Sequence, residues 1–165
     1  MNVQHLFTEH YDALYRYLVR LTGDADSAAD ATQEAFVRLI ERPPHDSQVR
    51  AWLFRVATNL VRDESRVRRR RLELLSEAAD RAPLGDQPLA PDSELESKER
   101  RLMVRSALER LSLKERTVLL MREQGFSHQE IAEAVDTTTK SVGSMIARAL
   151  QKLSVELAPF PETNE

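Results

Sequence analysis

Apolar residues recur at helical spacing along most of the chain. Over residues 3–22 they follow steps of four and three and form one stripe of Phe7, Tyr11, Leu14, Leu18 and Leu21. Such a stripe is typical of an amphipathic helix that packs one side against a core. The pattern therefore predicts a first helix over residues 3–22, which ends at Thr22-Gly23.

Two more helices are predicted before residue 76. The second begins at an N-cap, Asp24 or Asp26, and runs to about Arg42, ahead of Pro43-Pro44. Its buried stripe is Ala28, Ala35, Phe36, Leu39 and Ile40. The third helix is capped by Asp46 or Ser47 and runs to about Leu72, and its apolar side holds Leu53, Val56, Leu60 and Val67.

Residues 76–93 break the helical pattern. Three prolines, a glycine and several acidic residues fall there, a composition that cannot form a packed core and predicts a flexible linker between two domains. Four helical signals follow. The first runs from about Asp92 to Leu111, with Val104, Leu108 and Leu111 on one side. The next two open with the capping boxes Ser112–Glu115 and Ser127–Glu130. The last runs from about Thr138 to Leu157, with Val142, Ile146, Ala149 and Leu153 buried.

We therefore expect an all-α fold of two small helical domains, residues 1–75 and 94–158, followed by a frayed tail, residues 159–165. The chain has only 4 glycines and 7 prolines, and this scarcity of turn-forming residues argues against a many-stranded β fold. Each domain lies near the lower size limit for an independent core, so mutual docking or a large partner would stabilise both.

Composition excludes several classes of protein. The chain has no cysteine, which rules out disulfide scaffolds and cysteine-ligated metal sites. No apolar run approaches the ~18 residues of a membrane span, and Met1–His10 shows no secretory signal, so the expected location is the cytoplasm. The four histidines are scattered, and neither a glycine-rich phosphate loop nor a nucleophile elbow occurs. We expect no enzyme, no metal and no cofactor.

Charge is strongly segregated although the whole chain carries only −3. Residues 49–72 hold eight arginines against Asp63 and Glu64, a net +6, and residues 73–99 hold two basic against eight acidic residues, a net −6. One basic face of the third helix follows helical steps through Arg55, Asn59, Arg62, Arg66 and Arg69. Arginine forks bind phosphates, and an amide among them can read a base edge. A solvated face with a chance asparagine is the alternative.

The second capping box opens a helix-turn-helix pattern. A short helix, Gln129–Ala134, and the turn Val135–Thr137 precede the helix from Thr138. Burial of Ile131, Ala132, Val142 and Ile146 would brace the second helix, whose first residues can enter a major groove. The outer face is then Ser141, Ser144, Met145, Arg148 and Lys152. A plain helical hairpin is the alternative.

On the second helix, the face of Asp30, Gln33, Glu34, Val37 and Glu41 suits a protein partner but equally suits water.

Together these segments resemble the extracytoplasmic-function sigma factors of bacterial RNA polymerase. The opening helix Phe7–Tyr17 is similar to theirs, and Asp30–Phe36 matches their D-x-x-Q-E-x-F signature. Arg50–Asn59 with the following arginines resembles the helix that reads the −10 element. Leu111–Leu120 and Gly125–Ala132 resemble the domain that reads the −35 element. The resemblance covers about residues 5–157.

The resemblance implies roles for individual residues. Core polymerase, through the coiled coil of its largest subunit, would dock on Asp30, Gln33, Glu34 and Val37. The loop Pro43–Ser47 and the third helix would open promoter DNA and hold a flipped base, with contacts from Arg50, Trp52, Arg55, Asn59, Arg62, Arg66 and Arg69. The −35 element would be bound by Gln129, Thr138, Thr139, Lys140, Ser141, Ser144, Met145 and Arg148. The C-terminal domain would also bind the flap of the second-largest subunit, and the acidic linker would enter the polymerase cleft. An anti-sigma factor is a common further partner.

Three departures from the family pattern stand out. Asp136 occupies a turn position where glycine is usual, and Thr58 one where arginine is frequent. The recognition helix is also poor in basic residues. Two other hypotheses remain open at this point: an autonomous helix-turn-helix regulator, which would bind duplex DNA without polymerase, and a helical interaction module with no role on DNA.

Overall fold

The computed structural model describes residues 1–75 and 95–157, and these form helices joined by short connections. In chain order the elements are α1 (Val3–Thr22), α2 (Ala25–Glu41), the 3-10 turn η1 (Asp46–Gln48), α3 (Val49–Leu75), α4 (Leu95–Glu109), α5 (Leu113–Glu123), α6 (His128–Val135) and α7 (Thr139–Leu157). The all-α prediction is confirmed. The expected linker, residues 76–93, and the tail, residues 159–165, lie outside the described residues.

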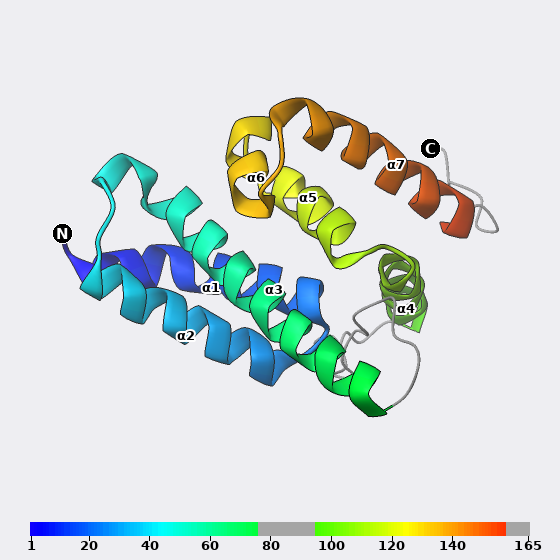
Figure 1. The fold of residues 1–165 in the computed structure, drawn as a ribbon, viewed down its shortest axis with the longest axis horizontal. Coiled ribbons are helices and arrows are strands. Elements are labelled where there is room, and N and C mark those ends of the chain that lie inside the picture. Colours follow the sequence, from blue (N-terminus) through cyan, green and yellow to red (C-terminus); the bar gives the residue numbers. More distant parts are fainter. Residues whose placement is uncertain (76–94, 158–165) are drawn as a thin grey trace.

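Helices α1, α2 and α3 form the N-terminal bundle (Figure 1). The side chain of Asn2 caps α1, and Gly23 ends it with a φ of 67°, which glycine adopts without steric cost. Asp24, the first of the two expected caps, accepts hydrogen bonds from the backbone N–H groups of Asp26 and Ser27. The 3-10 turn η1 runs directly into α3.

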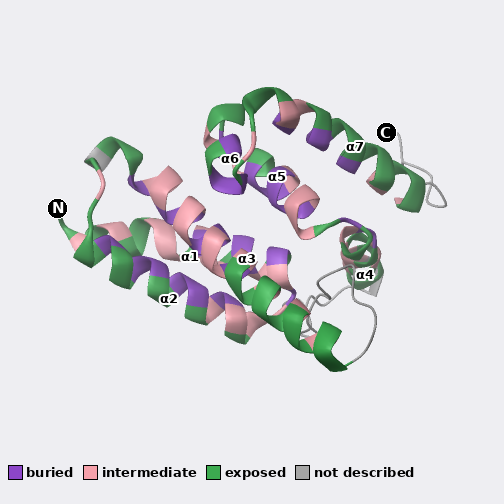
Figure 2. Ribbon diagram, in the orientation of Figure 1, coloured by how far each residue is buried: buried purple, intermediate pink, exposed green. Residues whose placement is uncertain are grey.

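The core of the N-terminal bundle is drawn from the inward stripes of its three helices (Figure 2). Leu14, Leu18, Leu39 and Leu53 are fully buried, and each such side chain stabilises the fold by about 1.5–3 kcal/mol. One polar pair lies in this core: the hydroxyl groups of Tyr17 and Thr58 are 2.8 Å apart. The remaining buried positions of the three helices are Leu21, Ala28, Ala31, Thr32, Ala35, Phe36, Val49, Phe54, Ala57 and Val61.

Helices α4 to α7 form the C-terminal bundle, and two features of its sequence hold α6 in place. Ser127 and Glu130 form the reciprocal capping box that was predicted. Asp136 ends α6 in the left-handed region, with a φ of 53°, which explains why a residue tolerant of that region stands there. The other predicted box is only half formed, because Ser112 caps the N–H of Glu115 but the reciprocal contact is absent.

Four apolar residues that the pattern placed inside the fold are exposed: Phe7, Ile40, Val67 and Val104. Phe7 still stacks on Tyr11 and Phe36 at the margin of the core. The last turns of α3 extend past the ends of α1 and α2 (Figure 1). Leu153, expected to be buried, is half-buried near the end of α7. The spacing of apolar residues identifies the apolar side of a helix. It does not show how much of that side the neighbouring helices cover.

The two bundles are docked against each other and share one core. α3 packs on α6, and α1 packs on α5. Phe126, between α5 and α6, is buried with its ring centroid 4.9 Å from that of Phe54 on α3. The mutual docking that their small size favours is therefore present in the structure.

Candidate nucleic-acid interface

Three of the seven candidate −10 residues contact the C-terminal bundle directly: Arg50, Arg55 and Arg62, here called the docked arginines. Arg50 donates from Nη2 to the carbonyl of Gln124 at 2.6 Å, and its guanidinium lies 4.1 Å from the ring centroid of Phe126. The same guanidinium lies 5.4 Å from the centroid of Phe54. The planar cation is therefore held by aromatic rings and a carbonyl from both bundles.

The other two docked arginines meet the C-terminal end of α6. Arg62 donates from Nη1 to the carbonyl of Ala134 at 3.2 Å and lies 3.8 Å from Oδ2 of Asp136. Arg55 lies 3.9 Å from Oε2 of Glu133. The end of a helix carries partial negative charge on its free carbonyls, so α6 offers these cations both carboxylates and a dipole.

The remaining candidate −10 residues lie elsewhere on α3. Trp52 and Asn59 are half-buried, and Arg69 is partly exposed. Arg66 is exposed and lies 4.0 Å from Oδ1 of Asp63, one turn away on the same helix. Asp63 is therefore paired with an arginine of its own helix. The basic face is therefore split: its first turns meet α6, and Arg66 lies exposed beyond them.

The candidate −35 residues lie on α6, on α7 and in the turn between them, and all but one are accessible. Ser141 is partly exposed, and its backbone N–H is capped by the hydroxyl of Thr138 at 3.1 Å. Gln129, Thr138, Thr139, Lys140, Ser144 and Arg148 are exposed. Together with Ser141 they form what is here called the helix-turn-helix face. A groove runs along part of it, lined by Gln129, Ala132, Glu133, Asp136, Thr137, Thr138 and Thr139.

Met145 was expected on that outer face and is instead buried, with 8% of its surface exposed. It is the third residue after Val142 and precedes Ile146, so it falls at the edge of the same inward stripe. The prediction that Met145 is free to contact DNA is therefore wrong. Val142, Ile146 and Ala149 are buried as expected.

The candidate polymerase-binding residues Asp30, Gln33, Glu34 and Val37 are all exposed on α2. Glu34 pairs with Arg38 at 3.0 Å along the same helix. Val37 and Ile40 expose 46% and 59% of their surface, which places two apolar side chains beside acidic and amide groups. This mixed surface is available to a protein partner.

A buried arginine that the sequence did not single out joins α5 to α1. Arg116 has 1% of its surface exposed and donates from Nη1 to the carbonyl of Leu21 at 3.1 Å. Burial lowers the pKa of Arg116 to about 10, partly offset by Glu109, so the guanidinium stays charged at neutral pH. An ion pair also joins the same helices, between Arg20 and Glu123 at 2.8 Å. No local pattern marks these residues, because their partners lie about a hundred positions away.

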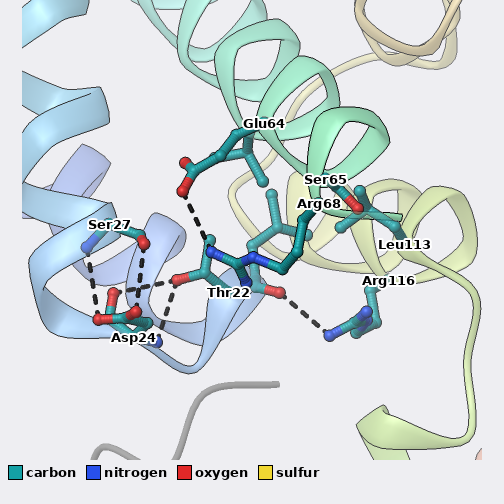
Figure 3. A pocket seen from close by; sticks show the side chains of 10 residues that line it. Thr22, Asp24, Ser27, Glu64, Ser65, Arg68, Leu113 and Arg116 are labelled. Atoms are coloured by element: carbon teal, nitrogen blue, oxygen red, sulfur yellow. Dashed lines mark hydrogen bonds and ion pairs between the residues drawn. The ribbon is translucent and has the colours of Figure 1, made fainter. Parts of the chain in front are cut away.

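Arg116 also borders a cavity of about 30 Å³ between the bundles (Figure 3). Figure 3 shows Thr22, Asp24 and Ser27 on one side and the Glu64–Arg68 ion pair on another. A space of this volume accommodates only about one or two water molecules. The cavity is thus a packing gap between polar groups rather than a ligand site.

Comparisons with known proteins identify the family. Residues 6–71 match the model of Sigma-70 region 2, and residues 101–153 match that of Sigma-70 region 4. The chain is 34% identical to the ECF RNA polymerase sigma factor SigL of Mycobacterium tuberculosis, covering 92% of this chain and 86% of the relative. It is 33% identical to the ECF sigma factor SigE of Mycolicibacterium smegmatis, covering 93% and 60%. The chain belongs to the extracytoplasmic-function sigma factors, non-catalytic initiation factors that act with RNA polymerase in promoter-specific transcription.

Two solved structures share the fold. The sigma factor RpoE in complex with the anti-sigma factor NepR from Bartonella quintana has a TM-score of 0.75 and 21% identity, covering 96% of this chain and 98% of that one. CnrH in complex with the cytosolic domain of CnrY has a TM-score of 0.65 and 23% identity, covering 96% and 89%. Within residues 1–75 and 95–157 no group of acidic and histidine side chains could hold a metal ion. None of the helices described is long and apolar enough to cross a membrane.

Proposed function

We propose a division of labour for this sigma factor between residues 1–75 and 94–158. The first domain docks core RNA polymerase and opens and reads the −10 element, and the second reads the −35 element. Residues 76–93 join them and enter the polymerase cleft. The observation that carries the proposal is the basic face of α3, in which Asn59 lies half-buried between Arg55 and Arg62.

Docking to polymerase is assigned to the outer side of α2. Val37 is exposed next to Gln33 and Glu34, so an apolar contact is flanked by groups that can set the register of a helical partner. The coiled coil of the largest polymerase subunit is the proposed partner. The flap of the second-largest subunit is proposed to bind the C-terminal bundle. An anti-sigma factor, the type of protein bound to RpoE in one structural neighbour, is proposed as a further partner.

DNA contacts are divided by chemistry. Arg66 and Arg69 suit phosphates, which position the protein at every sequence, whereas Asn59 and Trp52 suit bases of the opened strand. On the C-terminal bundle, Gln129 and Thr139 lie where the helix-turn-helix face meets a major groove. Lys140 and Arg148 supply its phosphate contacts, and Arg50, Arg55 and Arg62 complete the −10 contacts once they are accessible.

Permanganate footprinting tests this proposal, because it detects thymines that have become unpaired. We expect opening near −10 when wild-type chain and core polymerase are both present, and none with either alone. Val37→Glu should abolish opening by weakening the docking of polymerase, whereas Ser154→Glu, on an exposed position of α7, should not. Tight, sequence-specific protection of duplex DNA by the chain without polymerase would instead support the autonomous regulator.

A further inference from the structure

We propose that the C-terminal bundle is a built-in competitor for −10 DNA. In the docked arrangement, α6 and the loop before it occupy the docked arginines Arg50, Arg55 and Arg62, while the helix-turn-helix face stays open. The free chain can therefore present its −35 surface but withholds much of its −10 surface. This inference rests on the proposed function of α3.

The first support is the environment of Arg50. Its guanidinium is committed to the ring of Phe126 and the carbonyl of Gln124, both of which belong to the C-terminal bundle. A bidentate contact to a phosphate needs the same donors in the same plane. While Phe126 is docked, Arg50 therefore has one donor already bonded and one face of its guanidinium covered, which weakens its hold on a phosphate.

The second support is that α6 offers α3 the chemistry of a nucleic-acid backbone. Two carboxylates, Glu133 and Asp136, and the free carbonyl of Ala134 face Arg55 and Arg62. Arg62 is well shielded, with 14% of its side chain exposed. Phosphates and α6 thus compete for the same cations, and DNA binding at −10 requires this contact to break.

The third support is the contrast with the helix-turn-helix face. Thr139, Lys140 and Arg148 are exposed in the same structure in which the docked arginines are engaged by the C-terminal bundle. The docked arrangement therefore leaves the −35 surface exposed while the C-terminal bundle engages part of the −10 surface. A partner that separates the bundles would switch on −10 binding without altering the −35 surface.

The contacts also indicate how firmly the bundles are held. The Arg55–Glu133 pair is about half exposed on both sides, so water screens it and its contribution is small. Phe126 and Arg116, both buried, join the bundles through apolar packing and a shielded hydrogen bond. Phe126 therefore holds the bundles together, and the α6 carboxylates block phosphates.

The test measures how tightly the full chain binds a fluorescent single-stranded oligonucleotide of mixed sequence, without polymerase. Glu133→Gln with Asp136→Asn removes both competing carboxylates. Glu115→Gln with Glu156→Gln is the matched control, because these carboxylates pair with Lys152 and Arg110 inside the C-terminal bundle. We expect the first pair to raise affinity roughly two- to tenfold over the control, the effect of losing two ion pairs whose carboxylates are exposed. Equal affinities for the two variants would overturn the proposal.

A second measurement follows the separation of the bundles. Because the chain has no cysteine, Asp12→Cys on α1 and Ser154→Cys on α7 can be spin-labelled at unique exposed sites. The wild-type background should give one narrow distance distribution, and Phe126→Ala should broaden and lengthen it and raise oligonucleotide affinity. A lengthened distance with unchanged affinity would show that docking does not block the arginines.

Transcription with core polymerase distinguishes failure of the competitor proposal from failure of the proposed function. If the wild-type chain supports promoter-dependent transcription but removing the α6 carboxylates does not change oligonucleotide affinity, the competitor proposal fails and the function stands. If those variants bind more tightly but the chain never supports transcription, the proposed function fails and the intramolecular contact stands.

Discussion

The guanidinium of Arg116 on α5 donates a 3.1 Å hydrogen bond to the carbonyl of Leu21, in the last turn of α1. The contact joins residues 95 positions apart and is closed off from water. It pairs a cation with the negative end of a helix, which is a favourable placement in a shielded setting. The stability of the N-terminal bundle and its docking to the C-terminal bundle are thereby coupled.

We expect Arg116→Ala to lower the free energy of unfolding by about 2–4 kcal/mol, since it leaves a cavity and an unsatisfied carbonyl. Arg122→Ala, at an exposed position of the same helix, should change it by less than about 0.5 kcal/mol. Urea denaturation of the two variants measures both values. Equal changes in the free energy of unfolding for the two variants would show that the buried contact does not stabilise the fold.

Acid should destabilise the chain through His10. Burial lowers the pKa of His10 below its usual 6.5, and Arg50 and His5 lower it further, while Glu9 opposes them. Because the unfolded chain binds this proton more readily, stability that is present above about pH 6.5 is lost as the pH falls below it. His10→Gln should reduce the change of the urea midpoint between pH 7.5 and 5.5. His45→Gln, at an exposed loop position, should leave the wild-type dependence of the midpoint on pH. Identical slopes for all three proteins would contradict this account.

Base reading and phosphate binding on α3 should separate by mutation. Asn59→Ala should reduce promoter opening only at certain −10 sequences, by about 1–3 kcal/mol for a lost bidentate base contact. Arg66→Ala should weaken opening alike at all sequences, because phosphates carry no sequence information. A panel of promoters that differ only in the −10 element, used with core polymerase, distinguishes these outcomes. Uniform loss for Asn59→Ala would remove it from the reading site.

Gly143→Lys should strengthen DNA binding by the helix-turn-helix face. A Cβ there would meet only Cε1 of His128, at an ordinary 3.9 Å, so the site accepts a side chain. Lysine also favours the helix over glycine by up to ~1 kcal/mol. Affinity of the full chain for duplexes of unrelated sequence should rise, and the plot of log affinity against log salt should steepen by roughly 0.9 per added phosphate contact. A flat slope with unchanged affinity would place Gly143 away from DNA.

Much of this fold was predictable because its helices carry local signals. Ser127 and Glu130 mark the start of α6, Gly23 the end of α1, and Asp24 the start of α2, and each acts through neighbours within three or four residues. The departure at Asp136 is explained by its left-handed backbone, and the departure at Thr58 by its bond to Tyr17 in the core, where an arginine would bury an unpaired charge.

The docking of the bundles could not be predicted in the same way. Arg62 reads as one more exposed arginine in a basic run, and only the structure shows that it meets Ala134 and Asp136. The burial of Met145 was predicted wrongly because the residue lies at the boundary between the buried stripe and the exposed face of α7, and spacing along the helix locates that boundary only to about one residue. Long-range pairing depends on how whole helices pack, which the spacing of residues along one helix does not record.

The most direct measurement of the central claim is transcription from a library of promoter fragments by purified core polymerase. With the wild-type chain, we expect transcripts from a small subset of fragments that share one −10 and one −35 sequence, and none from core polymerase alone. Val37→Glu should abolish these transcripts, and Asn59→Ala should change which −10 sequences are used. Transcripts that do not depend on the chain, or a chain that leaves the output of core polymerase unchanged, would contradict the account.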